Sequence, residues 1–289
     1  MTATQSRAPL VSADDLLAAI DDPSIRIADV RWYLGEPERG QREHQQAHIP
    51  GAVFVDLDRD LAAVPGAGRH PLPHPTAFAD RMGQLGFGDE HTIVVHDAHH
   101  GQYGARMWWM LDRLGHDSVF VLDGGLPAWT AAGGELTAER TSHLRAAMTL
   151  LPEWSRTIDR DGIAAAEGSL DLVDVRAPER YSGEDEPIDP VGGHIPGARN
   201  CPLASLIDAE GYLLPTDELR TLLRGEGPRS ELPLVLSCGS GVTACFGLLA
   251  ARVAGLPDPM LYPGSYSDWA TAGMPIGTGP EPGGASAPG

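Results

Sequence analysis

The sequence is short of cysteine and of any long apolar segment. Its three cysteines are Cys201, Cys238 and Cys245, and no two of them have Cys-x-x-Cys spacing. An odd, unpaired set predicts neither a disulfide framework nor a cysteine-ligated metal. We therefore expect a reducing environment, and we place the protein in the cytoplasm.

Basic residues are also scarce. Lys and Arg together number 21, whereas Asp and Glu number 40, so the formal net charge is −19. A surface this negative repels phosphate backbones and anionic lipids, so we expect no nucleic-acid and no membrane partner. The longest nearly apolar stretch, residues 245–256, is too short to span a bilayer. Residues 1–11 lack the apolar centre of a signal peptide.

The remaining composition is that of a globular protein. Hydrophobic residues make up 42% and charged residues 21% of 289 residues, a length that favours two domains. Landmarks recur in the same order in both halves. Asp-Val-Arg at 29–31 returns at 174–176, and His-Ile-Pro-Gly-Ala at 48–52 returns at 194–198. Matching landmarks at nearly constant spacing indicate a duplicated domain.

Within each half, short β-branched runs alternate with helical patterns, which predicts an α/β fold. We expect two tandem domains, each a mostly parallel sheet flanked by helices. The expected strands are 25–30, 92–96, 119–122, 170–175, 234–237 and 260–262. The expected helices are 13–20, with Ser12 as its cap, 105–114 and 243–254.

Composition also suggests the domain boundaries. Residues 1–140 form the first domain and residues 157–276 the second, because 141–156 have mixed polar character without a strand period. Residues 277–289 are largely Gly, Pro and Ser, which predicts a disordered tail.

The segment most informative about chemistry surrounds Cys238. The apolar strand 234–237 leads into this cysteine, and a loop containing Gly239 and Gly241 then leads into a helix. Loop N–H groups and the helix N-terminus stabilise a thiolate over a thiol. This arrangement predicts a nucleophilic cysteine at the carboxyl end of a parallel strand, where α/β sheets bind ligands.

Cys238 has two other interpretations. One is a buried core cysteine, but the strand-loop-helix context and the two glycines make that the weaker reading. The other is a cysteine phosphatase, which needs an arginine six residues later to clamp phosphate. Position 244 is alanine, which argues against phosphoryl chemistry.

With these residues in view, the chain resembles the two-domain rhodanese-like sulfurtransferases from about residue 12 to residue 276. The resemblance rests on the paired His-Ile-Pro-Gly-Ala motifs, the Asp-Val-Arg segments and the Cys-Gly-Ser-Gly-Val-Thr loop at 238–243. That loop is similar to the 3-mercaptopyruvate branch, whereas thiosulfate enzymes typically carry basic residues there. The first half has Asp97 where the nucleophile would be, so it resembles the family's inactive domain.

The resemblance implies an activity. A sulfur atom would pass from 3-mercaptopyruvate to Cys238 as a persulfide. It would then go to cyanide or to a thiol acceptor, such as a thioredoxin-like protein or a small thiol. No cofactor is implied. Thiosulfate as the donor and a non-catalytic binding module remain the alternatives.

It also implies site residues. Ser240 would polarise or protonate the substrate, although a serine here could simply cap the next helix. Gly239, Gly241, Val242 and Thr243 would contact the substrate through the loop. These roles rest on the resemblance and on the position of the residues next to the nucleophile.

Arg180 matches a substrate-binding arginine of the subfamily and would hold the donor carboxylate, unless it is a solvated surface charge. Many relatives carry a second arginine several residues later. Residues 184–190 contain no basic residue, so this second contact is missing, moved or supplied by the other domain.

His48 would face the cleft near Ser240, although the matching His194 suggests that the motif is chiefly a structural turn. No metal site is expected at His70 and His74, or at the histidines 96, 99 and 100, because no ligand pattern accompanies them.

Overall fold

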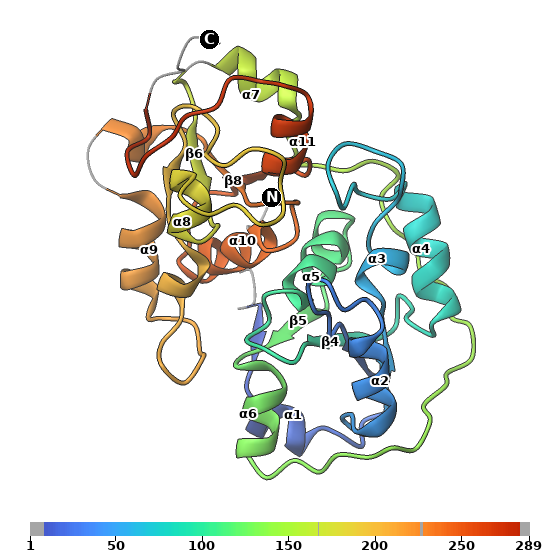
Figure 1. Ribbon diagram of the computed structural model, residues 1–289. Helices are drawn as coiled ribbons and strands as arrows, with labels where there is room; N and C mark the ends of the chain where they lie inside the picture. The colour runs from blue at the N-terminus through green and yellow to red at the C-terminus, as the bar shows by residue number, and fades with distance from the viewer. Residues whose placement is uncertain (1–8, 167, 226–227, 284–289) are drawn as a thin grey trace, which may run out of the picture.

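The computed structural model describes residues 9–166, 168–225 and 228–283. The two halves of the chain form two α/β domains, the first coloured blue to green and the second yellow to red in Figure 1. The N-terminal domain comprises β1 (Leu10–Val11), α1 (Ala13–Ala18), β2 (Ile25–Asp29), α2 (Arg39–Gln46), β3 (Ala52–Phe54), α3 (Leu57–Asp60), α4 (Pro75–Gln84), β4 (Thr92–His96), α5 (Gly104–Arg113), β5 (Val119–Leu122) and α6 (Gly125–Ala131).

The C-terminal domain repeats this plan. It comprises α7 (Arg160–Ala166), β6 (Asp171–Asp174), α8 (Pro178–Ser182), β7 (Arg199–Asn200), η1 (Leu203–Leu206), α9 (Thr216–Arg224), η2 (Pro228–Glu231), β8 (Leu234–Ser237), α10 (Ala244–Val253), β9 (Met260–Leu261) and α11 (Ser265–Thr271).

Both sheets are parallel in every described pairing. The first has the order β1-β5-β4-β2-β3 and the second β7-β6-β8-β9. Strands β7, β6, β8 and β9 therefore correspond in order to β3, β2, β4 and β5 of the first sheet. A single parallel bridge between Thr157 and Leu261 takes the place of the pairing between β1 and β5. The prediction of two domains with mostly parallel sheets is confirmed.

The predicted elements lie within a few residues of those observed. Three strands, 92–96, 119–122 and 234–237, have the expected bounds. Helix α1 begins where expected, because Ser12 Oγ accepts a hydrogen bond from the Asp15 N–H at 3.1 Å. The short strands β1, β3 and β7 were not predicted, since two or three residues are too few to show a period.

The repeated Asp-Val-Arg motif forms the same buried ion pair in both domains. Arg31 donates to the Asp29 carboxylate at 2.6 Å, and Arg176 donates to Asp174 at 2.7 Å. Each guanidinium also donates to the backbone carbonyl just before a His-Ile-Pro-Gly-Ala motif, that of Ala47 or Gly193. The two sequence motifs of each half are thus joined by one arginine.

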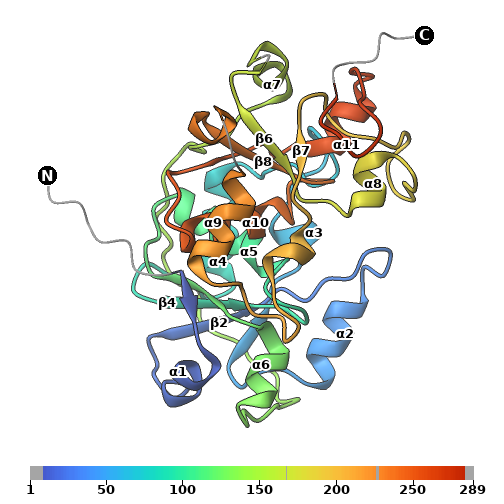
Figure 2. The ribbon, with the colours of Figure 1, turned by 90° about the vertical axis from the view of Figure 1, so that its left-hand side faces the viewer.

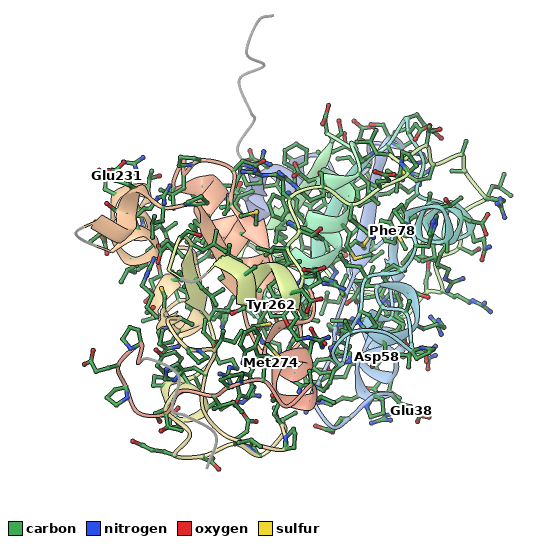
Figure 3. The ribbon with its side chains drawn as sticks, turned by 90° about the horizontal axis from the view of Figure 1, so that it is seen from above. Glu38, Asp58, Phe78, Glu231, Tyr262 and Met274 are labelled. Atoms are coloured by element: carbon green, nitrogen blue, oxygen red, sulfur yellow. The ribbon has the colours of Figure 1, made fainter. Side chains whose placement is uncertain are left out.

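Helices α5 and α10 pack against each other and join the domains, as both views show (Figures 1 and 2). Their buried side chains belong to one apolar cluster, which includes Trp108, Leu111, Phe246 and Leu249. Figure 3 shows the side chains of the two halves meeting, with Asp58 in the first and Tyr262 in the second. Because the interface is apolar and continuous, the two domains form one unit.

Ion pairs border this interface at one end. Arg113 donates to Asp258 at 2.7 Å, and Arg252 donates to Asp112 at 2.9 Å. None of the helices in the described part of the chain is long and apolar enough to cross a membrane.

The expected linker, residues 141–156, runs along the N-terminal domain. The Ala146 N–H donates to the Gly83 carbonyl, and Trp154 Nε1 donates to the Pro73 carbonyl at 2.9 Å. These contacts fix its course over the first domain.

The expectation of a disordered tail at 277–289 needs correction for its first part. Gly277 pairs with His194 through two backbone hydrogen bonds of 2.9 Å, and Gly279 N–H donates to the Ser182 carbonyl at 2.8 Å. Backbone pairing supplies an order that the composition does not reveal. Residues 284–289 lie outside the described residues.

Candidate active site

Cys238 follows β8 directly and opens the loop that leads into α10. Strand β8 lies between β6 and β9, so the loop emerges at the centre of the sheet edge. The Cys238 residue is 1% exposed. The Gly241 N–H donates to Cys238 Sγ at 3.1 Å, which is the contact expected of a loop that stabilises a thiolate.

Gly241 has a conformation that requires glycine. Its φ is +75°, and a Cβ atom built there would lie 2.2 Å from the Pro263 carbonyl oxygen. The loop therefore curls tightly over the sulfur because residue 241 has no side chain.

Residues 265–267, which begin α11, hold the cysteine loop by hydrogen bonds. The Cys238 N–H donates to Ser265 Oγ at 3.1 Å, and the Tyr266 N–H donates to the Cys238 carbonyl at 3.0 Å. The Ser267 N–H donates to the Gly239 carbonyl at 2.9 Å. The first turn of α11 thus fixes the backbone on both sides of the sulfur.

Cys238 lines a cavity of about 120 Å³ between the two domains. The C-terminal domain contributes the cysteine loop together with Arg180 and Ile188. The N-terminal domain contributes Trp32, Leu34, Arg69, His70 and Tyr103. Of the residues predicted for the site, the cavity brings together Arg180, Cys238, Gly239, Ser240, Val242 and Thr243.

A chain of hydrogen bonds crosses the cavity wall from Ser240 into the N-terminal domain. Ser240 Oγ lies 2.8 Å from His70 Nδ1, and His70 Nε2 lies 3.0 Å from Asp58 Oδ1. Trp32 Nε1 donates to the other Asp58 oxygen at 2.9 Å. The hydrogen bond from His70 holds the pKa of Asp58 below its ordinary value, so this carboxylate stays ionised.

Sequence reasoning did not find this relay. In the sequence His70 stands out only for its spacing from His74, and no pattern marks Asp58. The described residues contain no group of His, Cys, Asp and Glu side chains able to hold a metal ion. Because His70 and Ser240 are 170 residues apart in the chain, no local spacing signals their contact.

The expectation that His48 faces Ser240 is corrected by the structure. His48 is 2% exposed, and its ring nitrogens lie 2.6 Å and 3.1 Å from the carbonyl oxygens of His44 and Glu139. It does not line the cavity. As its repeat in the second domain suggested, the motif histidine packs a turn, and the histidine beside Ser240 is His70.

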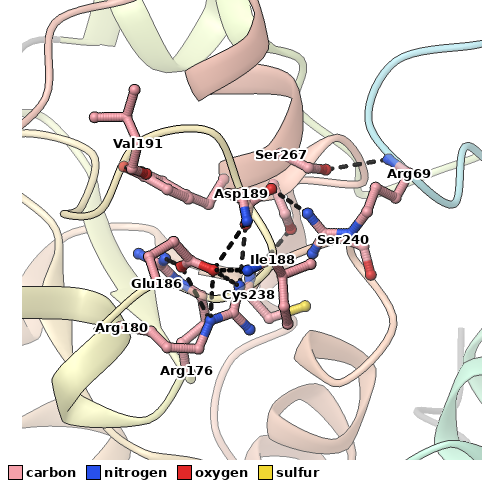
Figure 4. Close-up of polar contacts among 12 residues, drawn as sticks. Arg69, Arg176, Arg180, Glu186, Ile188, Asp189, Val191, Cys238, Ser240 and Ser267 are labelled. Atoms are coloured by element: carbon pink, nitrogen blue, oxygen red, sulfur yellow. Dashed lines mark hydrogen bonds and ion pairs between the residues drawn. The ribbon is translucent and has the colours of Figure 1, made fainter. Parts of the chain in front are cut away.

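Arg180 lies in a network of alternating charges, seen in Figure 4, which also includes Arg176 paired with Glu186 at 3.2 Å. Its guanidinium donates to Glu186 at 2.9 Å and to Asp189 at 3.0 Å. Arg69, from the N-terminal domain, donates to the other Asp189 oxygen. Burial raises the pKa of Asp189 above its ordinary value.

Both guanidiniums reach the cysteine loop. A Cβ atom built on Gly239 would lie 2.7 Å from Arg69 Nη2 and 3.4 Å from Arg180 Nη1. In the described part of the chain, the hydrogen bonds of these two guanidiniums to carboxylates use other nitrogens. The sequence left the second arginine missing, moved or supplied by the other domain. The structure places Arg69 of the N-terminal domain beside Arg180.

In the N-terminal domain the corresponding loop surrounds Asp97. Its carboxylate accepts four backbone hydrogen bonds of 2.7–3.0 Å, from the N–H groups of His99, Gly101, Tyr103 and Gly104. The loop thus holds an anion at the place of the cysteine. A carboxylate cannot accept a sulfur atom as a thiolate does.

The other two cysteines are core residues. Cys201 is 4% exposed and Cys245 is fully buried. Burial raises the pKa of Cys201, and it raises the pKa of Cys245 to about 12. Both therefore stay protonated at neutral pH, and none of the three cysteines is joined in a disulfide.

The fold and site define a two-domain α/β protein with one cysteine loop at the cavity between its domains. The family model of the rhodanese-like domain matches residues 12–132 and again residues 161–272. The chain belongs to the rhodanese-like family, with two copies of its domain.

Relatives that match along nearly the whole chain carry two kinds of name. A Pseudomonas aeruginosa protein named "Probable 3-mercaptopyruvate sulfurtransferase" is 43% identical over 95% of this chain and 99% of its own. The thiosulfate sulfurtransferase of Cricetulus griseus is 34% identical over 86% of this chain and 85% of its own.

Among solved structures, the Escherichia coli protein SseA, described as a 3-mercaptopyruvate sulfotransferase, has a TM-score of 0.81 and 33% identity. The match covers 90% of this chain and 100% of SseA.

Proposed function

We propose that the protein transfers sulfur from 3-mercaptopyruvate through a Cys238 persulfide to a thiol acceptor. The observation that carries the proposal is the cavity itself, where the cysteine loop faces two guanidiniums and a serine joined to a proton relay. The names of the P. aeruginosa and E. coli relatives support the choice of donor.

In the first half-reaction the Cys238 thiolate attacks the sulfur of the donor. A sulfur–sulfur bond forms and the carbon–sulfur bond of the donor breaks. The electron pair of the broken bond leaves with pyruvate as its enolate, and the enzyme retains the persulfide. This is covalent catalysis, which divides the transfer into two easier steps.

Ser240 and the residues behind it manage the proton. The Ser240 hydroxyl donates to the donor carbonyl oxygen, where enolate charge develops. Protonated His70 replaces that proton through Nδ1, and Asp58 stabilises the imidazolium through Nε2. The hydrogen-bond distances among these three residues support this role.

Arg180 binds the donor carboxylate, with Arg69 beside it as a second guanidinium. Charge-assisted hydrogen bonds of this kind orient a planar carboxylate. Gly239 lets the anion approach both arginines, since any side chain there would meet them. Val242 and Thr243 also line the cavity, and the Gly241 N–H holds the loop over the sulfur.

In the second half-reaction cyanide or a thiol, such as a small thiol or a thioredoxin-like protein, takes the outer sulfur. No cofactor enters either step. The N-terminal domain carries no sulfur, because Asp97 stands where a cysteine would be. It forms one wall of the cavity and contributes His70 and Asp58. Three free cysteines agree with a reducing cytoplasm.

Thiosulfate is the second candidate donor. The two guanidiniums beside Gly239 supply positive charge for a dianion, and the hamster relative bears the corresponding name. The loop itself carries no basic side chain, and this favours the donor with a single carboxylate.

Intact mass measurement after incubation with 3-mercaptopyruvate tests the proposal. The wild type should gain one sulfur atom, which a thiol then removes, and Cys238→Ser should gain none. Cys201→Ser is the matched control and should behave as the wild type. A sulfur adduct that persists in Cys238→Ser would show that another residue carries it.

A further inference from the structure

Arg106 is a buried arginine for which the proposed mechanism has no role. It lies on α5 of the N-terminal domain and is 0% exposed. In the described part of the chain, no carboxylate lies within ion-pair distance of it, and its Nε atom has no hydrogen-bond partner. A buried charge without a counter-charge is costly, so its presence needs an explanation.

The contacts of Arg106 reach both parts of the candidate site. Nη1 donates to the Gly241 carbonyl at 3.0 Å, and Gly241 N–H in turn donates to Cys238 Sγ. Nη2 donates to the carbonyl of His70 at 3.0 Å, and the His70 ring contacts Ser240. One guanidinium thus holds the residue that contacts the sulfur and the residue that contacts the serine.

Two thiols bear on Arg106, that of Cys245, with which it also shares a hydrogen bond, and that of Cys238. Burial lowers the pKa of Arg106, and negative charge on these sulfurs opposes the shift. Burial also raises the pKa of Cys245 to about 12, so Cys245 is neutral at physiological pH. Cys238 Sγ accepts from the N–H of the same Gly241 whose carbonyl accepts from Arg106, so this loop residue joins the guanidinium to the sulfur.

Among the described residues, no other group around Cys238 takes part in this pairing of Arg106 with the sulfur. Burial raises the pKa of Tyr103 to about 12, so this phenol is neutral. Arg69 and Arg180 face the cavity and share the carboxylates of Glu186 and Asp189. Arg106 is different because it lies beneath the loop, away from solvent and from screening ions.

We propose that Arg106 is a positioning residue that serves as the fixed counter-charge of the Cys238 thiolate and holds the cysteine loop and His70 in register. The N-terminal domain, which has Asp97 at the corresponding position, thereby activates the cysteine of the C-terminal domain. This inference rests on Cys238 being the nucleophile of the proposed function.

Alkylation of Cys238 by iodoacetamide across a pH series, without any donor, tests the counter-charge. Peptide mass mapping reports the labelled residue. In Arg106→Gln the midpoint of the alkylation curve should move up by about one pH unit, a roughly tenfold loss of thiolate at a fixed lower pH. The midpoint for Arg106→Lys should stay near that of the wild type, because the charge remains.

Arg31→Gln is the matched control. Arg31 is a buried arginine of the same domain, but its charge is paired with Asp29 and it does not line the cavity. It should lower the melting temperature without moving the alkylation midpoint.

A folded Arg106→Gln protein with the wild-type midpoint would overturn the proposal. If that variant does not fold, Arg106→Lys decides, since a raised midpoint there would show that charge at this position is not what matters. Neither readout uses a sulfur donor. Failure of persulfide formation from 3-mercaptopyruvate would instead count against the proposed function alone.

Discussion

His70 and Ser240 share a hydrogen bond of 2.8 Å across the boundary between the two domains. The histidine belongs to the half that lacks the cysteine, and the serine to the half that has it. Only docking of the domains brings the proton relay to the nucleophile, so the N-terminal domain is part of the catalytic apparatus in the proposed function.

Breaking this contact should slow the donor half-reaction. We expect His70→Ala to lower kcat by about 10²-fold, within the range of general acid–base catalysis, with a smaller change in KM. Stopped-flow measurement of pyruvate release gives the rate. An unchanged rate would exclude His70 from proton transfer.

Asp58→Asn should have a related but smaller effect. The hydrogen bond with His70 lowers the pKa of Asp58, so its carboxylate is ionised at and above the ordinary pKa of an aspartate. The ionised carboxylate stabilises a protonated His70, and this stabilisation is lost as pH falls through the lowered pKa. The amide removes the support at every pH, and about tenfold loss of kcat at neutral pH is expected. If the variant matches the wild type from neutral pH to acid, Asp58 has no role in the relay.

Arg69 and Asp189 should have opposite effects on donor affinity. Arg69→Ala removes a guanidinium, and the KM for 3-mercaptopyruvate should rise by about tenfold. Asp189→Asn removes the competing carboxylate at nearly constant shape, so KM should fall. Steady-state kinetics of both variants check this. A rise in KM for Asp189→Asn would show that the pair only fastens the domains together.

Cysteine reactivity should separate the three thiols. Since burial raises the pKa of Cys245 to about 12, its thiolate forms only as pH rises toward that value, and Cys201 is shifted in the same direction. Limited iodoacetamide treatment near neutral pH should therefore label Cys238 alone in the native protein, and all three cysteines after unfolding. Peptide mapping would reveal any native labelling of Cys245.

Asp97 should matter for stability. Replacement by alanine leaves four loop N–H groups without their acceptor, and a loss of at least about 2 kcal/mol in the free energy of unfolding is expected. Urea denaturation measures it. Asp97→Asn, which keeps one acceptor oxygen, should lose less. Equal stability of the alanine variant and the wild type would contradict the argument.

Donor choice follows from the charge of the loop. The wild type should prefer 3-mercaptopyruvate over thiosulfate by at least about tenfold in kcat/KM, because the loop itself offers a dianion no basic side chain. One preparation assayed with both donors decides the matter. Equal turnover would mean that Arg69 and Arg180 together serve thiosulfate as well.

The sequence by itself predicted the longer strands of both sheets and the loop that carries Cys238. Strand 234–237, the glycines that follow and the helix after them are local features, because strand period, helix caps and loop flexibility depend on neighbouring residues. The duplicated domain was also visible, since each copy repeats its own motifs.

Tertiary structure alone decided which residues surround Cys238. His70, Arg69 and Arg106 lie more than a hundred residues before it, and no periodicity or spacing relates them to the loop. They arrive there because the apolar faces of α5 and α10 dock in one orientation, which sets the register of every polar group across the boundary. His48 belongs to a motif that occurs in both domains, and in the structure it packs a turn and does not line the cavity. A motif that both domains share therefore does not mark the single cavity between them.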